Sequence, residues 1–139
     1  MLDLTQERDA HIDQHLREDH ILWLGSVRPD GRPHLVAVWF LWTGKDLLIF
    51  SKPHAQKIRN LRQNPQVMVA LDNTNQGNIT LEGEAKLLDD PLVSATLPEY
   101  VAKYGVHITG IGYTPETMAS VYSQAIRITP TRFYDAPTG

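Results

Sequence analysis

Two apolar runs, Leu35 to Trp42 and Leu47 to Phe50, constrain the fold more than any other feature of the sequence. Apolar runs of this length without a polar interruption are typical of β-strands that are covered on both faces. The Thr43-Gly44 pair between them is a tight-turn signal. We therefore expect two neighbouring antiparallel strands, both central in their sheet.

Further segments carry strand signals, and together they predict a sheet of about six strands. Arg28-Pro29-Asp30-Gly31 has proline at position i+1 and glycine at i+3 of a type I turn, which predicts a hairpin. Gly83 lies in a segment of alternating apolar and polar residues and predicts a β-bulge or a close approach by another group. Pro130 interrupts the last segment. The strands expected are Ile21–Val27, Leu35–Trp42, Leu47–Phe50, Gln66–Asp72, Asn78–Leu88 and Ala125–Tyr134.

The remaining segments are expected to form helices and loops. Asn73–Gly77 is a polar loop, and Tyr104–Tyr113 is a glycine-rich, irregular segment without the glycine spacing of a dinucleotide-binding motif. An antiparallel sheet of this size tends to close, and 139 residues with 42% hydrophobic content fit one domain with its own core. We therefore expect a mainly β single domain over residues 1–139. The helices expected are Thr5–Glu18, Ala55–Arg62, Asp90–Lys103 and Pro115–Tyr122.

The second apolar strand leads through Ser51-Lys52-Pro53-His54 into a helix that begins amid positive charge. Residues 45–62 hold five of the 13 lysine and arginine residues and one of the 16 acids, in a chain of formal net charge −3. A helix N-terminus presents unpaired N–H groups that stabilise a phosphate, and Lys57 adds a full charge close to it. The pattern indicates a phosphate site, with a merely solvated basic face as the alternative.

Composition excludes several classes of function. The sequence has no cysteine, which excludes thiol catalysis, disulfide bonds, iron–sulfur clusters and thiolate zinc sites. Neither an apolar membrane span nor a signal peptide is visible, so we expect a cytoplasmic protein without a membrane partner. The mildly acidic composition disfavours nucleic acid as a partner. His11 and His15 have metal-ligand spacing, but no HExxH motif surrounds them and no metal site is expected.

The aromatic residues of the first apolar run indicate a subunit interface. Trp39, Phe40 and Trp42 supply more aromatic area than the interior of one small barrel needs, and aromatic residues are enriched at protein interfaces. A single core that absorbs all three is the alternative. We expect a homodimer formed through the face that bears this strand.

Short motifs spread over most of the chain from Ile21 to Arg132 carry a family resemblance. They are LGSVRPDGRP from Leu24, VWF from Val38, Ser51, KIRNL from Lys57, NPQV from Asn64, PEY from Pro98, Tyr104-Gly105 and IRITPTR from Ile126. In this order and spacing they resemble the pyridoxamine 5'-phosphate oxidase-like split-barrel superfamily, and most closely its small members that are labelled as dependent on the deazaflavin coenzyme F420. The resemblance implies a six-stranded antiparallel split β-barrel of the FMN-binding type. It also implies a homodimer with two identical sites at the subunit interface.

The resemblance further implies where F420 or FMN would bind. The strand from Val36 to Trp39 would run beside the ring, partly through its backbone. Phe50 and Ser51 would flank the phosphate, and Lys57 would pair with it. Asn78 would reach the cofactor of the partner subunit. The cofactor-binding residues predicted are Val36, Ala37, Val38, Trp39, Phe50, Ser51, Lys52, Gln56, Lys57 and Asn78.

Two departures from the family pattern bear on the choice of cofactor. Gln56 stands where flavin-binding oxidases of the family have arginine, and Lys52, His54 or Arg59 is the candidate to replace that charge. The C-terminal basic and tryptophan pattern of true pyridoxamine phosphate oxidases is missing, so vitamin B6 oxidation is not expected. Positive charge spread over Lys52, Arg59 and Arg62 favours F420, whose tail carries several carboxylates, over FMN.

A flavin-type cofactor carries the redox chemistry itself, so we expect an oxidoreductase that transfers hydride to a small organic substrate, with no catalytic residue assigned. His34 and His107 are candidate proton donors. A non-catalytic carrier or sensor of the same cofactor is one alternative. A haem-binding relative, in which His20, His34 or His107 would reach the iron, is another. The side chains expected to shape the substrate space, or else to belong to the core, are Trp39, Tyr104 and Tyr122.

Overall fold

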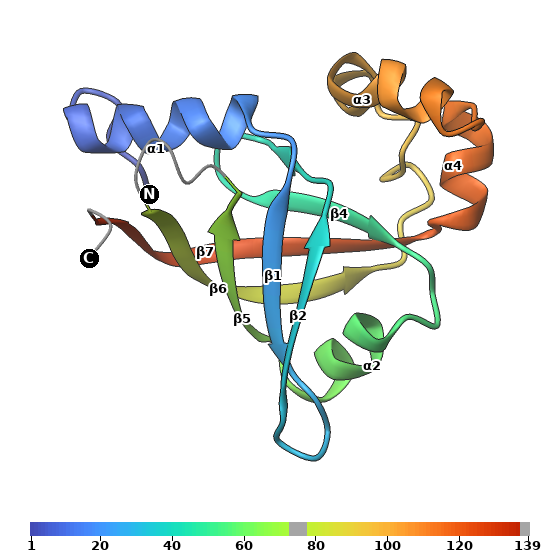
Figure 1. Ribbon diagram of the computed structural model, residues 1–139, viewed down its shortest axis with the longest axis horizontal. Coiled ribbons are helices and arrows are strands. Elements are labelled where there is room, and N and C mark those ends of the chain that lie inside the picture. Colours follow the sequence, from blue (N-terminus) through green and yellow to red (C-terminus); the bar gives the residue numbers. More distant parts are fainter. Residues whose placement is uncertain (73–77, 137–139) are drawn as a thin grey trace.

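The chain folds around one antiparallel sheet of seven strands, in the order β2-β1-β5-β6-β7-β4-β3, that curls into a half-barrel (Figure 1). The computed structural model describes residues 1–72 and 78–136, so the loop predicted at Asn73–Gly77 lies outside the described residues. The mainly β class expected from the sequence is confirmed. The strands are β1 (Leu22–Val27), β2 (Pro33–Val38), β3 (Leu41–Trp42), β4 (Leu47–Ser51), β5 (Gln66–Leu71), β6 (Asn78–Leu88) and β7 (Gln124–Ala136).

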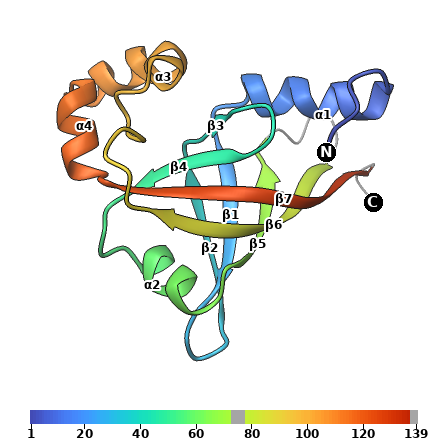
Figure 2. The ribbon, with the colours of Figure 1, turned by 180° about the vertical axis from the view of Figure 1, so that it is seen from behind.

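The helices surround the sheet at its ends (Figures 1 and 2). One end of the half-barrel carries α1 (Glu7–Glu18), and the other carries α2 (Gln56–Gln63). The remaining two, α3 (Pro98–Gly110) and α4 (Pro115–Val121), stand together beyond the end of β4. In residues 1–72 and 78–136, no helix has the length and apolar character that a membrane span requires.

Apolar stripes on α1 and α2 close the core. Ile12 and Leu16 of α1 and Ile58 of α2 are almost completely buried. They belong to one cluster with inward side chains of the sheet such as Leu24 and Ile49. Each such side chain contributes about 1.5–3 kcal/mol when it leaves water, which is why these helices form where the sequence predicts them. The predictions for α1, α2 and α4 are confirmed to within two residues at each end.

The run from Leu35 to Trp42 does not form the single, central, doubly covered strand that its sequence predicts. It divides into β2 and β3, which are the two edges of the sheet. The division falls at Phe40, because its N–H donates to the Tyr104 hydroxyl (3.0 Å) and its carbonyl accepts from Lys103 Nζ (3.0 Å). Two side chains of α3 thus replace a neighbouring strand, and the sheet has seven strands instead of six. The prediction is correct for β4, which is buried along its whole length.

The segment predicted to be irregular, Tyr104–Tyr113, is largely helical, and the helix predicted from Asp90 begins only with α3. Tyr100, Tyr104 and Ile108 recur every four residues and are all buried. This spacing predicts a helix, whereas the glycines among these residues favour the irregular segment that the sequence predicts. A glycine inside a helix costs only about 1 kcal/mol relative to alanine, less than one buried tyrosine contributes.

Two predictions that concern glycines are confirmed. The N–H of Gly31, whose φ is 90°, donates to the Arg28 carbonyl (2.9 Å) and closes the predicted turn. A register shift between β6 and β7 lies at Gly83. A Cβ atom there would lie 2.8 Å from Ile128 Cγ2 and 3.0 Å from the Thr129 carbonyl oxygen, so the close approach of the two strands requires glycine.

Candidate functional site

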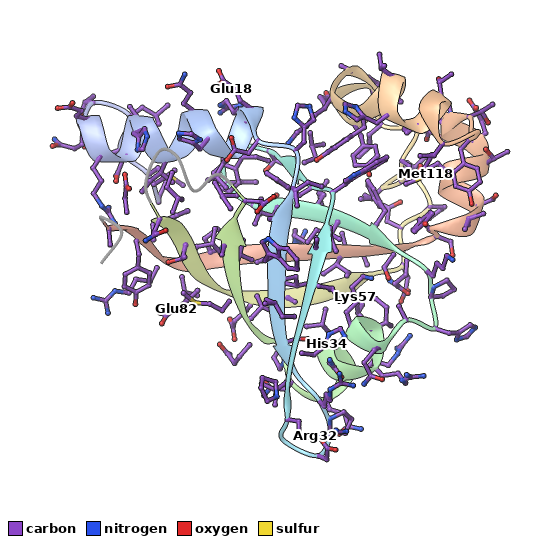
Figure 3. All side chains as sticks on the ribbon, in the orientation of Figure 1. Glu18, Arg32, His34, Lys57, Glu82 and Met118 are labelled. Atoms are coloured by element: carbon purple, nitrogen blue, oxygen red, sulfur yellow. The ribbon has the colours of Figure 1, made fainter. Side chains whose placement is uncertain are left out.

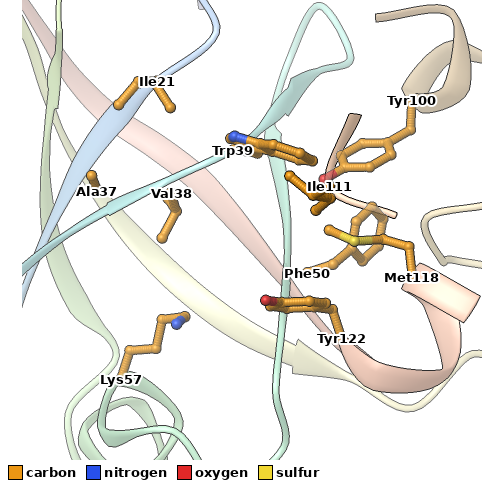
Figure 4. A pocket seen from close by; sticks show the side chains of 10 residues that line it. All are labelled: Ile21, Ala37, Val38, Trp39, Phe50, Lys57, Tyr100, Ile111, Met118 and Tyr122. Carbon is orange, nitrogen blue, oxygen red and sulfur yellow. The ribbon is translucent and has the colours of Figure 1, made fainter. Parts of the chain in front are cut away.

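A cavity of about 240 Å³ lies between the half-barrel and the α3–α4 pair (Figure 4). The sheet supplies one side through β2 and β4, α3 and α4 supply the opposite side, and the first turn of α2 supplies one end. The lining is apolar and aromatic except at that end. The residues that line the cavity are Ile21, Ala37, Val38, Trp39, Phe50, Lys57, Tyr100, Ile111, Met118 and Tyr122.

The aromatic side of the cavity is held in place from behind. Trp39 stacks on Tyr104, with ring centroids 4.8 Å apart and ring planes 8° from parallel. The Tyr104 hydroxyl accepts a hydrogen bond from the Phe40 N–H and donates one to the His20 carbonyl oxygen at 2.6 Å. Tyr104 therefore positions Trp39 and does not itself line the cavity, so of the two roles expected for it, substrate space or core, it has the role in the core.

The same side of the cavity carries no charge. Burial raises the pKa of Tyr100 and of Tyr104, so both phenols stay neutral throughout the physiological range. Phe50 meets the Tyr100 ring edge-on, with centroids 4.9 Å apart, and Met118 adds a polarisable thioether to the lining. This surface suits a flat, uncharged, conjugated group.

The end of the cavity at α2 is cationic. Lys57 points into the cavity from the first turn of the helix (Figure 4) and has no hydrogen-bond or ion-pair partner among the described residues. Burial lowers the pKa of Lys57, and the charge of Lys52 lowers it further. The backbone N–H groups of Gln56 and Lys57 also have no backbone acceptor within the described part of the chain. An anion at this position would stabilise both the ammonium group and the helix N-terminus.

Half of the residues predicted to bind a cofactor line the cavity: Ala37, Val38, Trp39, Phe50 and Lys57. The structure thus brings together residues from β2, β4 and α2 that are up to 20 positions apart in the sequence. Their part in cofactor binding stays a prediction.

Other predicted residues lie next to the cavity without lining it. Val36 packs against the core of the half-barrel. Ser51 is buried, and its hydroxyl donates to the Lys52 carbonyl oxygen at 2.9 Å. The exposed Lys52 side chain places its ammonium nitrogen 5.7 Å from the centre of the Tyr122 ring, which does line the cavity.

Gln56 is hydrogen-bonded to Arg59, one of the residues proposed to replace the missing arginine charge. The Gln56 amide nitrogen donates to Asn60 Oδ1 (2.8 Å), and its carbonyl oxygen accepts from Arg59 Nη2. Arg59 is exposed, as is His54. In this arrangement neither Arg59 nor His54 supplies the charge of the missing arginine inside the cavity.

Asn78 and the three histidines that were singled out also lie outside the lining. Asn78 begins β6 and pairs with Ala136, at the opposite end of β6 from the cavity. His20 and His107 are exposed, with ring centroids 5.1 Å apart beside Trp39. His34 is half-buried on β2, and its Nδ1 is buried without a hydrogen-bond partner among the described residues.

Sequence reasoning missed Ile21, Tyr100, Ile111 and Met118, which line the cavity. Two of them carried a detectable signal. Tyr100 shares its helical spacing with other buried residues of α3, and Met118 lies four residues before Tyr122, so both face one side. Ile21 and Ile111 lie just outside regular elements, and no local pattern indicates them.

Residues 1–72 and 78–136 contain no group of three or more histidine, aspartate and glutamate side chains that could hold a metal ion. His11 Nδ1 lies 2.8 Å from Asp135 Oδ2, and His15 Nδ1 lies 3.1 Å from Asp19 Oδ1. Each ring thus has a carboxylate partner of its own.

The sequence model of the family described as pyridoxamine 5'-phosphate oxidase matches residues 9–136. The chain belongs to this family. The match confirms the resemblance carried by the short motifs. Members of the family bind flavins such as FMN, and oxidoreductases are among them. No curated protein sequence matches the chain significantly.

Solved structures share the fold. An F420 reductase has 25% sequence identity and a TM-score of 0.70, over 88% of this chain and 94% of its own. General Stress Protein 26 from Bacillus anthracis has 21% identity and a TM-score of 0.74, over 96% and 97%. HutZ, a haem storage protein from Vibrio cholerae, has 16% identity and a TM-score of 0.65, over 91% and 92%. The fold therefore occurs in a reductase and in a storage protein and does not by itself choose an activity.

Proposed function

We propose that the protein is a flavin- or deazaflavin-dependent oxidoreductase that binds its cofactor in this cavity and transfers hydride to a small organic substrate. The observation that carries the proposal is Lys57, a half-buried cation without a partner among the described residues, at one end of an aromatic cavity. A flavin-type cofactor has the complementary chemistry, because it joins a flat conjugated ring to an anionic phosphate.

The residues present fit such a group in polarity and in shape. Lys57 and the free N–H groups of α2 supply donors for a phosphate. Trp39, Phe50 and Tyr122 supply aromatic surface for a ring. The position of β2 at the edge of the sheet leaves backbone N–H and C=O groups on its free side available to the polar rim of a ring.

When bound and reduced, a flavin or deazaflavin supplies the hydride. The chain itself supplies binding and position: Lys57 neutralises the phosphate, while the aromatic side excludes water and is kept in place by Tyr104. Within the described residues, Lys57 is the one charged side chain of the lining. An uncharged, conjugated substrate therefore fits the cavity best.

Two features support F420 over FMN. Lys52, Arg59 and Arg62 are all exposed on or before α2, so positive charge is spread over a surface on which a tail of carboxylates can lie. Gln56, in the place of a second phosphate-binding arginine, leaves the phosphate itself with fewer charged donors.

We also propose a homodimer. The cavity is smaller than the roughly 300–1,000 Å³ typical of ligand sites, so one chain encloses only part of a cofactor. On the outer face of the sheet, Leu35 and Met68 line a groove, and Trp23 is exposed on the same face of β1. A second copy that covers this face would bury these apolar side chains and complete the site.

Light scattering at micromolar concentration tests the dimer. We expect a dimer for the wild type and a monomer for Leu35→Glu, because a charge would be buried at the interface. The matched control is Leu92→Glu, since Leu92 is also exposed but lies before α3, away from the outer face. A monomeric wild type contradicts the proposal.

Titration of the purified protein with F420, FMN and haem tests the function. We expect saturable binding of F420, weaker binding of FMN, and reduction of a conjugated substrate by the reduced cofactor. Tight binding without turnover of any substrate would favour the carrier or sensor. Selective binding of haem would overturn the proposal.

A further inference from the structure

We propose that His34 is a second ligand for the anionic group that binds at Lys57, and that its imidazole takes up a proton when the anion binds. The inference deepens the proposed function, because it assigns to His34 the role that the family's arginine would have at Gln56.

The first observation is an unsatisfied atom. Among the described side chains that are not exposed, His34 Nδ1 is the one buried nitrogen or oxygen atom without a hydrogen-bond partner. Buried polar atoms are almost always hydrogen-bonded, and an unpaired one costs about 1–3 kcal/mol. A structural histidine in the core would have found a partner, as His11 and His15 have with carboxylates.

The second observation is the position of the ring. His34 lies opposite Ser26 on β1, and the Ser26 hydroxyl oxygen accepts from Asn60 of α2 at 3.0 Å. His34 therefore faces the side of β2 on which α2 packs, as Val38 does four residues further along the strand. Figure 3 shows His34 and Lys57 beside α2.

The third observation is the charge around the ring. Burial lowers the pKa of His34, and the charges of Arg28, after β1, and Lys57, on α2, lower it further. His34 also borders the outer groove, where Glu82 of β6 lies, but that carboxylate is not among the charges that shift its pKa. In the free chain, positive charges thus meet at one place, and they favour the neutral form of the imidazole.

An anion reverses this balance. A phosphate beside Lys57 would cancel the repulsion from Lys57 and Arg28 and favour the imidazolium, whose N–H then has an acceptor. The binding step is balanced by one proton from solvent. The pKa of His34 is then higher in the bound state than in the free state. Between these two pKa values, the affinity for the anion rises as pH falls, and outside this pH window it is constant.

The experiment is an NMR titration of the histidine rings in the wild-type protein from about pH 5 to 9, a range around the ordinary histidine pKa. It is carried out without a ligand, with inorganic phosphate, and then with FMN. The expected result is a rise of about one unit in the pKa of His34, equivalent to tenfold tighter binding at the acidic end. His11, on α1 at the other end of the half-barrel, is the internal control and is expected not to move.

Calorimetry in buffers of different ionisation enthalpy supplies a second readout. We expect uptake of a fraction of a proton near pH 6.5 that is absent in His34→Gln and retained in His11→Gln. The change in the protonation of the phosphate itself is common to the two variants and is removed by comparing them. His34→Gln is expected to weaken binding by about tenfold at pH 6 and less at pH 8.5.

The outcomes separate this inference from the proposed function. If FMN or F420 binds while the pKa of His34 stays constant, the inference is wrong and the function stands. If phosphate raises the pKa of His34 but no flavin or deazaflavin binds, the anion site stands and the function fails. If neither phosphate nor a cofactor binds, both are wrong.

Discussion

The two ends of the cavity are built in opposite ways. At the aromatic end the polar groups directly behind the lining are paired: the Tyr104 hydroxyl bonds both to Phe40 and to His20, and Lys103 bonds to the Phe40 carbonyl. At the cationic end Lys57 and His34 Nδ1 have no partner among the described residues, although both are at least half-buried.

This difference separates stability from binding. A paired buried group stabilises the free fold, and its removal leaves the partners unsatisfied. An unpaired buried cation destabilises the free fold, and it is stabilised only when an anion binds beside it. Substitutions at the aromatic end should therefore change the free energy of unfolding, and those at the cationic end should change affinity.

The largest effect is expected for Tyr104→Phe. This change leaves the Phe40 N–H and the His20 carbonyl without their partner, so we expect a loss of about 2–4 kcal/mol in the free energy of unfolding. Urea denaturation measures it as a lower midpoint at constant slope. The control is Tyr113→Phe, whose hydroxyl has no hydrogen bond to the described residues. Equal midpoints for the two variants would contradict the assigned role of Tyr104.

Lys57→Ala should show the opposite signature. Loss of a charged hydrogen bond weakens cofactor binding by about 1.5–3 kcal/mol, while the free energy of unfolding stays within about 0.5 kcal/mol of the wild type or rises. Fluorescence titration and urea denaturation measure the two quantities. The matched control is Lys45→Ala, which removes a lysine charge on the β3–β4 turn, a position away from the cavity. Unchanged affinity in Lys57→Ala would show that the basic turn is only a solvated face.

Gln56→Arg sharpens the comparison by adding a donor at the cationic end. We expect FMN to bind about tenfold more tightly, because a second charged donor meets the phosphate. F420 should gain less, since its binding energy is spread over its tail. Gln63→Arg at the other end of α2 is the matched control. An equal gain for both variants would indicate nonspecific attraction.

The smallest effect concerns the charge at the aromatic end. Burial lowers the pKa of Lys103 to about 8, whereas the unfolded chain keeps this proton up to about 10.5. Between these values the unfolded state binds more protons, so stability rises with pH over this window. Because the ammonium group is partly exposed, screening keeps the effect below about 1 kcal/mol.

The free energy of unfolding at about pH 7.5 and 9.5, on the two sides of this pKa, checks the prediction. The wild type and Lys45→Met should gain stability at the higher pH relative to Lys103→Met. The absence of any difference between the variants would mean that the cation–π contact of Lys103 with Phe40, at 3.8 Å, offsets its burial.

The elements that the sequence predicts well are those whose signal is local. The period of α1 and α2, the turn at Arg28–Gly31 and the bulge at Gly83 depend on residues within a few positions of one another. The apolar content of β4 likewise indicates a covered strand. Lys57 at the start of α2 is predicted by the same local logic, because a helix N-terminus is a property of the segment itself.

What the sequence alone could not determine depends on contacts between distant segments. The same apolar pattern gives a buried β4 and an exposed edge strand β2, because position in the sheet and not composition decides coverage. The run around Phe40 is broken by side chains of α3, more than 60 residues away. That His34 Nδ1 has no partner among the described residues is visible only once β2, β1 and α2 are packed together, since whether a buried atom is hydrogen-bonded depends on all its neighbours.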